Sequence, residues 1–151
     1  MKEFHIQDKT IIFGTYAELG VQMYNLCFTV VTQDMFDKKK FYIAYDQKYV
    51  ELSPSSQKFL VFHEIGHIVN GDFEKKYQTI HNKNILRTFG ISNKMEFNAD
   101  KFAVKRVGKK VALKCLFEMK KKNIFTSSLD LIQRAIVIIF GWWRFHFKGT
   151  L

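Results

Sequence analysis

Hydrophobic and polar positions divide the chain into strand-like runs near its beginning and helical runs further on. Apolar side chains at near-helical spacing predict a helix over residues 10–26. The β-branched run at residues 28–32 predicts a strand. Residues 41–45 and 48–52 predict two further strands around a tight turn at Asp46-Gln47. The first third of the chain is therefore expected to form one helix and a three-stranded sheet.

Helical patterns follow from residue 53 onwards. Ser53 and Pro54 suit the N-cap and the first position of a helix that runs to about residue 69 and stops at Asn70-Gly71. Residues 71–92 are polar and predict a long connection. Three more helices are expected at about 92–107, 109–121 and 128–145. This order of elements predicts an α+β fold in which a three-stranded sheet packs against several helices.

The composition fits a single domain spanning residues 1–151. Apolar residues make up 47% of the chain, which is enough to bury a core. No apolar run reaches the length of a membrane span, and the first residues do not resemble a signal peptide. Cys27 and Cys115 sit in apolar contexts and are expected to be buried thiols in a reducing compartment. A cytoplasmic location is therefore the expectation.

The net charge of +10 changes the range of partners to consider. Lysines gather at residues 38–40, 75–76, 109–110 and 120–122, and such a surface attracts nucleic acid, anionic membrane or acidic proteins. No recognition motif accompanies these lysines, so a solvated surface is the favoured interpretation and a nucleic-acid partner is possible but not favoured. Residues 128–147 could lie on a membrane surface, but closing the core is the favoured role for this apolar helix.

The sequence His63-Glu64-Ile65-Gly66-His67 carries the main chemical signal. On a helix, two histidines four residues apart lie on one face and can bind one Zn²⁺. Glu64 is rotated away from the line of the two histidines, and is placed to take a proton from a water rather than to bind the metal. Gly66 leaves space for a neighbouring element to approach closely.

A third metal ligand is expected from the helix that begins near residue 92. Glu96 is the best candidate, and Asp100 lies one turn later on the same face. A carboxylate at Asp100 can accept the outer N–H of a zinc-bound imidazole. Ala99 is small and would allow close packing of the two helices. The alternative is that both acids are ordinary exposed residues in the first turn of a helix.

The His63–His67 motif followed by Glu96-x-x-Ala99-Asp100 resembles the ImmA/IrrE family of zinc peptidases. The resemblance covers about residues 40–107; beyond it, Ser128, Ile132 and Arg134 weakly echo the family's C-terminal helix, and the C-terminal helices at about 109–147 are otherwise dissimilar. It implies a small zincin-like domain with Zn²⁺ held by His63, His67 and Glu96. It also implies a regulatory protease that cuts a protein substrate, such as a transcriptional repressor of a mobile element or of stress genes.

HtpX-like peptidases, which act at membranes, share the two motifs and form the alternative. They usually have a longer stretch between the motifs and flanking membrane spans, which this sequence lacks. A further alternative is a non-catalytic basic module that binds DNA or a DNA-bound repressor. The cleavage site and the oligomeric state stay open.

Two more groups of residues complete the expected site. His81, with Tyr77 and Tyr45, is a candidate to stabilise an oxyanion, on position alone. Zincins commonly bind their substrate as an added strand on a sheet edge. The strand carrying Phe41, Ile43 and Tyr45 could be that edge.

Overall fold

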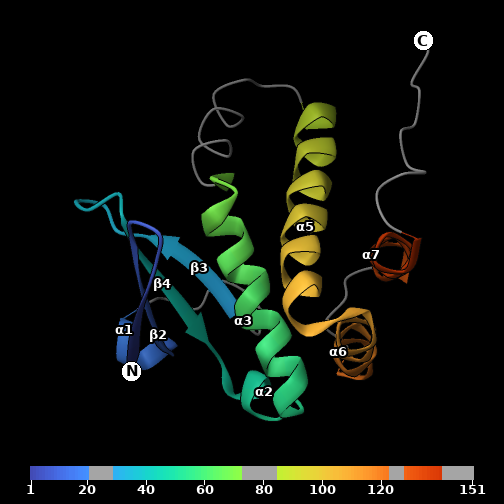
Figure 1. The fold of residues 1–151 in the computed structure, drawn as a ribbon, viewed down its shortest axis with the longest axis horizontal. Helices are drawn as coiled ribbons and strands as arrows, with labels where there is room; N and C mark the ends of the chain where they lie inside the picture. Colours follow the sequence, from blue (N-terminus) through green and yellow to red (C-terminus); the bar gives the residue numbers. More distant parts are fainter. Residues whose placement is uncertain (21–28, 73–84, 123–127, 141–151) are drawn as a thin grey trace.

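A computed structural model of the chain describes residues 1–20, 29–72, 85–122 and 128–140. This part of the chain forms a mixed α+β fold with four strands and six helices (Figure 1). The sheet has the order β1-β2-β4-β3, with β2 and β4 parallel and the other two pairs antiparallel. Its strands are β1 (Lys2–Ile6), β2 (Lys9–Thr15), β3 (Thr29–Gln33) and β4 (Lys40–Tyr45).

The prediction of a helix over residues 10–26 is wrong for residues 10–15, which form a strand, and holds for a single helical turn at residues 16–19. β2 and a one-turn helix, α1 (Tyr16–Leu19), occupy that region, and residues 21–28 lie outside the described part. A tight turn with Gln7 at a φ of 57° lets β1 pair with β2, and Ile11 is fully buried in the sheet. The sheet is therefore four-stranded rather than three-stranded.

The strand predicted at residues 48–52 is a short helix, α2 (Gln47–Val50). The Asp46 side chain accepts a hydrogen bond from the Tyr49 backbone N–H at 3.0 Å and so caps this helix. Tyr49 and Leu52, three residues apart, are then both buried. Asp46-Gln47 is thus a helix start and not a hairpin turn.

The helix that carries the two histidines, α3 (Pro54–Val69), has the predicted bounds. It ends at Asn70, and Gly71 follows with a φ of 66°, a conformation that favours glycine. At its start, the Ser53 side chain does not cap the helix. The Ser53 hydroxyl and backbone N–H instead both donate to the Glu118 carboxylate, at 3.1 and 3.2 Å.

Three further helices complete the described fold. They are α5 (Ile85–Val107), α6 (Lys109–Lys121) and α7 (Ser128–Phe140). α5 starts earlier than predicted, so the connection after α3 is shorter than residues 71–92. The corner between α5 and α6 falls at Gly108, as expected, with a φ of 86°. The end predicted for the last helix, near residue 145, lies outside the described residues.

α3 lies between the sheet and the other long helix (Figure 1). It contacts β3 and β4 on one side, and α5 and α6 on the other. One apolar cluster joins α3 to the sheet through Ile11, Ile43 and Ile65. A second cluster joins α3 to α6 and α7 through Phe59, Leu116 and Ile138. Burial of both sides fixes how α3 is rotated, and therefore where its histidines point.

Three findings bear on the expected surroundings of the protein. None of the described helices is long and apolar enough to cross a membrane. In α7, Leu131 and Ile138 are buried, which agrees with a helix that closes the core, while Ile132 and Phe140 are exposed. Cys115 is a buried free thiol, as expected, and Cys27 lies outside the described residues.

Candidate metal centre

Close packing of α3 against α5 creates the candidate site. A Cβ atom built on Gly66 would lie 2.8 Å from the Cα and 3.1 Å from the carbonyl oxygen of Ala99. Any side chain at position 66 would therefore push the backbones of the two helices apart. This agrees with the two expectations that Gly66 leaves space for a neighbouring element and that the small Ala99 allows close packing of the two helices. The approach brings Glu96 over the two histidines.

Three donor atoms converge at this point. The Nε2 atoms of His63 and His67 lie 3.1 Å apart. The Glu96 carboxylate lies 3.2 Å from Nε2 of His63 and 3.5 Å from Nε2 of His67. Within the described residues, these three side chains form the one group found that could hold a metal ion. The residues predicted from the sequence as ligands are therefore brought together.

The donor set fits a divalent zinc ion. Two ligand atoms of a tetrahedral zinc, each at about 2.0–2.1 Å, are separated by about 3.3 Å. The three distances in the site are all close to that value. Two imidazoles and one carboxylate are also the ligand types of a catalytic zinc, which keeps its fourth position open.

His63 is oriented by a buried chain of charges. Its Nδ1–H donates to Asp100 at 2.8 Å, and Arg134 of α7 donates to both Asp100 oxygens at 2.7 and 2.8 Å. Asp100 is 1% exposed and Arg134 is 7% exposed. Because an ionised carboxylate only accepts hydrogen bonds, one proton of His63 sits on Nδ1, so a metal bound at Nε2 would displace only the proton on that second nitrogen.

His67 is oriented in the same way by a closer residue. Its Nδ1 lies 2.9 Å from the carboxylate of Asp72, just beyond the end of α3. Asp72 is 5% exposed. Both histidines therefore present Nε2 to Glu96 and Nδ1 to a carboxylate, which is the pattern of histidine ligands in metal sites.

The charges of the site shift the pKa values of its groups. Burial alone would lower the pKa of His63, but the hydrogen bonds to Asp100 and Glu96 raise it to about 10. Burial alone would raise the pKa of Glu96, but the hydrogen bond and charge of His63, together with the charge of Arg134, lower it to about 2. Burial is likewise outweighed at Asp100, where the Arg134 guanidinium holds the pKa far below its usual range. Both carboxylates are therefore ionised at neutral pH.

Glu64 follows His63 on α3 but does not belong to the group of three donors. Its side chain is buried, and one carboxylate oxygen accepts a hydrogen bond at 2.7 Å from the hydroxyl of Thr29 on β3. This bond holds the carboxylate between the helix and the sheet. The arrangement agrees with the expectation that Glu64 does not bind the metal.

The predicted substrate strand needs a correction. β4, which carries Phe41, Ile43 and Tyr45, is paired on both sides, by β2 and β3, and is not an edge. Phe41 and Ile43 are buried in the core. An inner strand has no free backbone groups for a substrate. The edge nearest α3 is β3, and no other described strand pairs with its outer side.

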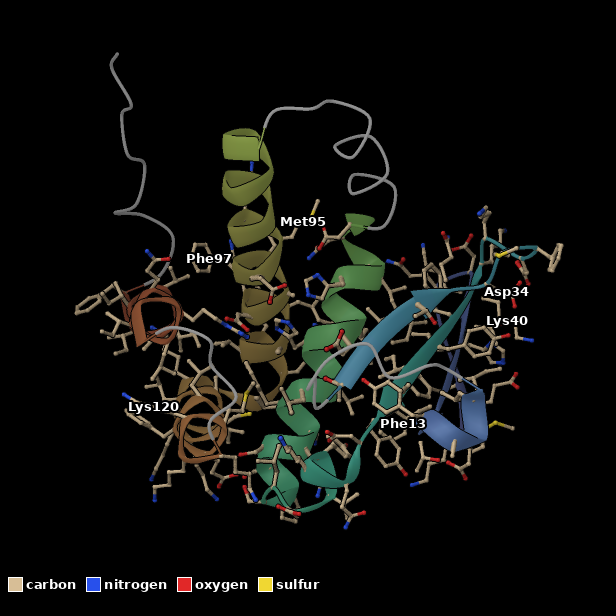
Figure 2. All side chains as sticks on the ribbon, turned by 180° about the vertical axis from the view of Figure 1, so that it is seen from behind. Phe13, Asp34, Lys40, Met95, Phe97 and Lys120 are labelled. Carbon is tan, nitrogen blue, oxygen red and sulfur yellow. The ribbon has the colours of Figure 1, made fainter. Side chains whose placement is uncertain are left out.

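Of the three oxyanion candidates, the structure describes Tyr45 alone. His81 and Tyr77 lie outside the described residues, so their role stays a prediction. The ring of Tyr45 packs against Phe13 and Tyr49, with centroids 4.7 and 4.9 Å apart. These contacts belong to an aromatic cluster between the sheet and α2 (Figure 2 labels Phe13).

Three contact residues of the site had no predicted role in it. The role of Asp72 could have been predicted from local sequence, because an acid just after a helix can reach a histidine in the last turn of that helix. Arg134 carries a weaker signal, as the single basic residue of a largely apolar helix. Thr29 carries none, because its bond to Glu64 spans 35 residues of sequence.

Comparisons with known proteins do not add to this description. No protein-family model matches the chain, and neither the curated proteins nor the solved structures contain a significant match.

Proposed function

We propose that the protein is a zinc-dependent metallopeptidase. The observation that carries the proposal is the convergence of His63, His67 and Glu96, with Glu64 beside them on α3. Carboxylates on both outer nitrogens of the histidines also favour a metal ligand role over two ordinary buried histidines. A structural zinc site would have a fourth protein ligand in place of the acid beside it.

In this proposal His63, His67 and Glu96 hold the zinc ion. When bound, zinc supplies Lewis-acid chemistry, which makes a water acidic near neutral pH and polarises a carbonyl group. Glu64 accepts a proton from the attacking water at its carboxylate, and delivers it to the amine nitrogen as the peptide bond breaks. Thr29 holds the Glu64 carboxylate in position from one side. The ionised Asp100 keeps His63 in the tautomer that binds metal.

The substrate in this proposal is a peptide segment that lies along β3. This edge strand begins at Thr29, which is hydrogen-bonded to Glu64. No described strand pairs with the outer backbone groups of β3. An extended peptide can add to such an edge through main-chain hydrogen bonds. The resemblance to the ImmA/IrrE family supports a protein substrate, such as a transcriptional repressor, and a regulatory role in the cytoplasm.

Metal analysis combined with peptide cleavage tests the proposal. Protein stripped with a chelator and restored with one equivalent of zinc is incubated with a library of proteome-derived peptides, and new peptide ends are identified by mass spectrometry. The expected result is zinc-dependent cleavage by the wild type and none by Glu64→Gln, which still binds one zinc. Glu96→Ala is expected to lose zinc affinity.

Glu3→Ala, at an exposed position on β1, is the matched control for the loss of one glutamate. It is expected to keep both zinc and cleavage. Cleavage by Glu64→Gln at the wild-type rate would contradict the role of Glu64. Zinc binding that is equally tight in Glu96→Ala would contradict the metal site itself.

A further inference from the structure

α6 presents a basic face that the proposed peptidase chemistry does not use. This helix contains five lysines and a single acid, Glu118. Lys109 is also exposed but donates to the carbonyl oxygen of Ile139 at 2.9 Å, so we define the α6 basic face by the other exposed members: Lys110, Lys114, Phe117, Lys120 and Lys121. At 100° per residue, four of these, all except Lys120, fall within about 60° of the helix circumference. They therefore form a row about 16 Å long on one side of the helix.

The lysines of this face are mostly free of carboxylates. Lys110, Lys120 and Lys121 make no ion pair with any other residue that the structure describes. Lys114 lies 3.5 Å from Glu118, whose carboxylate also accepts two hydrogen bonds from Ser53. Figure 2 shows Lys120 on the outer side of α6, away from α3. Positive charge is thus left uncompensated along the row.

An exposed aromatic ring lies within the row. Phe117 is 59% exposed, between Lys114 and Lys121 on the same side of the helix. Its neighbours Leu116 and Cys115 are buried and fill the core on the other side of the helix. The core therefore does not require an apolar side chain at position 117. Cations in a row with an exposed aromatic ring are the combination that binds a single-stranded nucleic acid, by contacts to phosphates and stacking on a base.

The same residues disfavour the other anionic partners. A helix that lies in a membrane surface inserts its apolar side, but the apolar side of α6 is packed in the core through Ala112, Leu116 and Met119. An acidic protein would use the lysines but would gain no stacking from Phe117. Base reading in duplex DNA pairs Arg or Lys with guanine and Asn or Gln with adenine; the face carries lysines but no Arg, Asn or Gln, so it offers little to read a sequence of mixed bases.

We propose that the α6 basic face binds single-stranded nucleic acid without sequence preference. Lys110, Lys114, Lys120 and Lys121 contact the phosphates, and Phe117 stacks on a base. The face is formed by α6 alone, so this binding does not depend on zinc or on Glu64.

Fluorescence anisotropy with labelled oligothymidylate and oligouridylate of 20 nucleotides tests the proposal on the full chain. Four phosphate contacts predict that the logarithm of the affinity falls with the logarithm of the salt concentration with a slope of about −3. The triple variant Lys110→Glu, Lys114→Glu, Lys121→Glu is expected to bind at least about tenfold more weakly. Phe117→Ala is expected to bind several-fold more weakly at an unchanged salt slope.

The matched control is a second triple variant with the same change in net charge, Lys2→Glu, Lys38→Glu, Lys58→Glu, at exposed positions outside α6. It is expected to lose less than about threefold, because more distant charges are screened. If the α6 triple does not fold, judged by circular dichroism, the same positions are changed to Gln and about half the effect is expected.

Several results would overturn the proposal. One is an equal loss of oligonucleotide affinity in the two triple variants, and another is an unchanged affinity for Phe117→Ala. A third is the absence of binding at about 50 mM salt, where phosphate contacts are strong. Tighter binding of duplex DNA, polyglutamate or phosphatidylglycerol vesicles than of the oligonucleotides would instead identify another anionic partner.

Discussion

The two histidines of α3 are supported by carboxylates at very different distances along the chain. His67 contacts Asp72, five residues further on. His63 contacts Asp100, 37 residues further on, and Asp100 is held by Arg134 from α7. Both arrangements leave Nε2 facing Glu96. One half of the site is therefore a property of a short segment, whereas the other half exists only when α3, α5 and α7 are packed together.

This difference predicts how each half is coupled to folding. Removing one partner of a fully buried charge pair strongly destabilises a protein, because the remaining charge stays buried without that partner. Arg134 and Asp100 form such a pair. The local pair of His67 and Asp72 orders only a few residues. Substitutions on the long-range side should change both folding and metal binding, and those on the local side chiefly metal binding.

The largest effect is expected at Arg134. Arg134→Met removes the guanidinium that donates to both oxygens of the buried Asp100 carboxylate, and should lower the free energy of unfolding by about 3–5 kcal/mol. Urea unfolding of the metal-free protein measures this. Arg106→Met is the control, because Arg106 stacks on Phe102 at an exposed position and should contribute less than about 1 kcal/mol. Equal losses in the two variants would contradict the buried chain of charges.

Asp100→Asn and Asp72→Asn compare the two halves directly. Each should weaken zinc affinity about 10–100-fold, because each removes the carboxylate behind a ligand histidine. Only Asp100→Asn should also lower the free energy of unfolding substantially, by about 3 kcal/mol, since it removes the buried carboxylate that accepts two hydrogen bonds from Arg134. Competition with a fluorescent zinc chelator and urea unfolding give the two values. A larger loss of stability for Asp72→Asn would reverse the comparison.

Gly66→Ala should move α5 away from α3, and so disturb the long-range half of the site, without removing any charge. The added Cβ meets the backbone of Ala99, so α5 has to shift, at a cost of about 1–3 kcal/mol in the free energy of unfolding. Zinc affinity should fall as well, because Glu96 and Asp100 move with α5. Because the clash is with backbone atoms, Ala99→Gly in the same chain should not restore either value. A restored zinc affinity in the double variant would show that the Ala99 methyl group sets the spacing.

A small change in stability is expected at Thr29. Thr29→Val keeps the shape of the side chain but removes the hydrogen bond to Glu64, and should cost about 1–2 kcal/mol. Zinc affinity should stay unchanged, while the cleavage rate falls about tenfold or more if Glu64 is the general base. Thr32→Val, on the other face of β3, is the control. A rate for Thr29→Ser close to that of Thr29→Val would contradict a role for the hydroxyl.

Much of the helical part could be predicted from the sequence, because its signals are local. Ser53-Pro54 and Asn70-Gly71 mark the ends of α3, and Gly108 marks the corner between α5 and α6. The strands were less predictable. The side chains of residues 10–26 suit both a helix and a strand, and pairing with β1 and β4 decided for β2.

The sequence by itself identified the candidate metal ligands. A spacing of four residues on a helix places His63 and His67 together, and the chemistry of zinc points to an acid such as Glu96 as the next ligand. Only the tertiary structure decided what surrounds them. Arg134 behind Asp100, Thr29 against Glu64 and the inner position of β4 all depend on contacts between distant segments. Such contacts follow from the burial of whole helix and sheet faces, which no local pattern specifies.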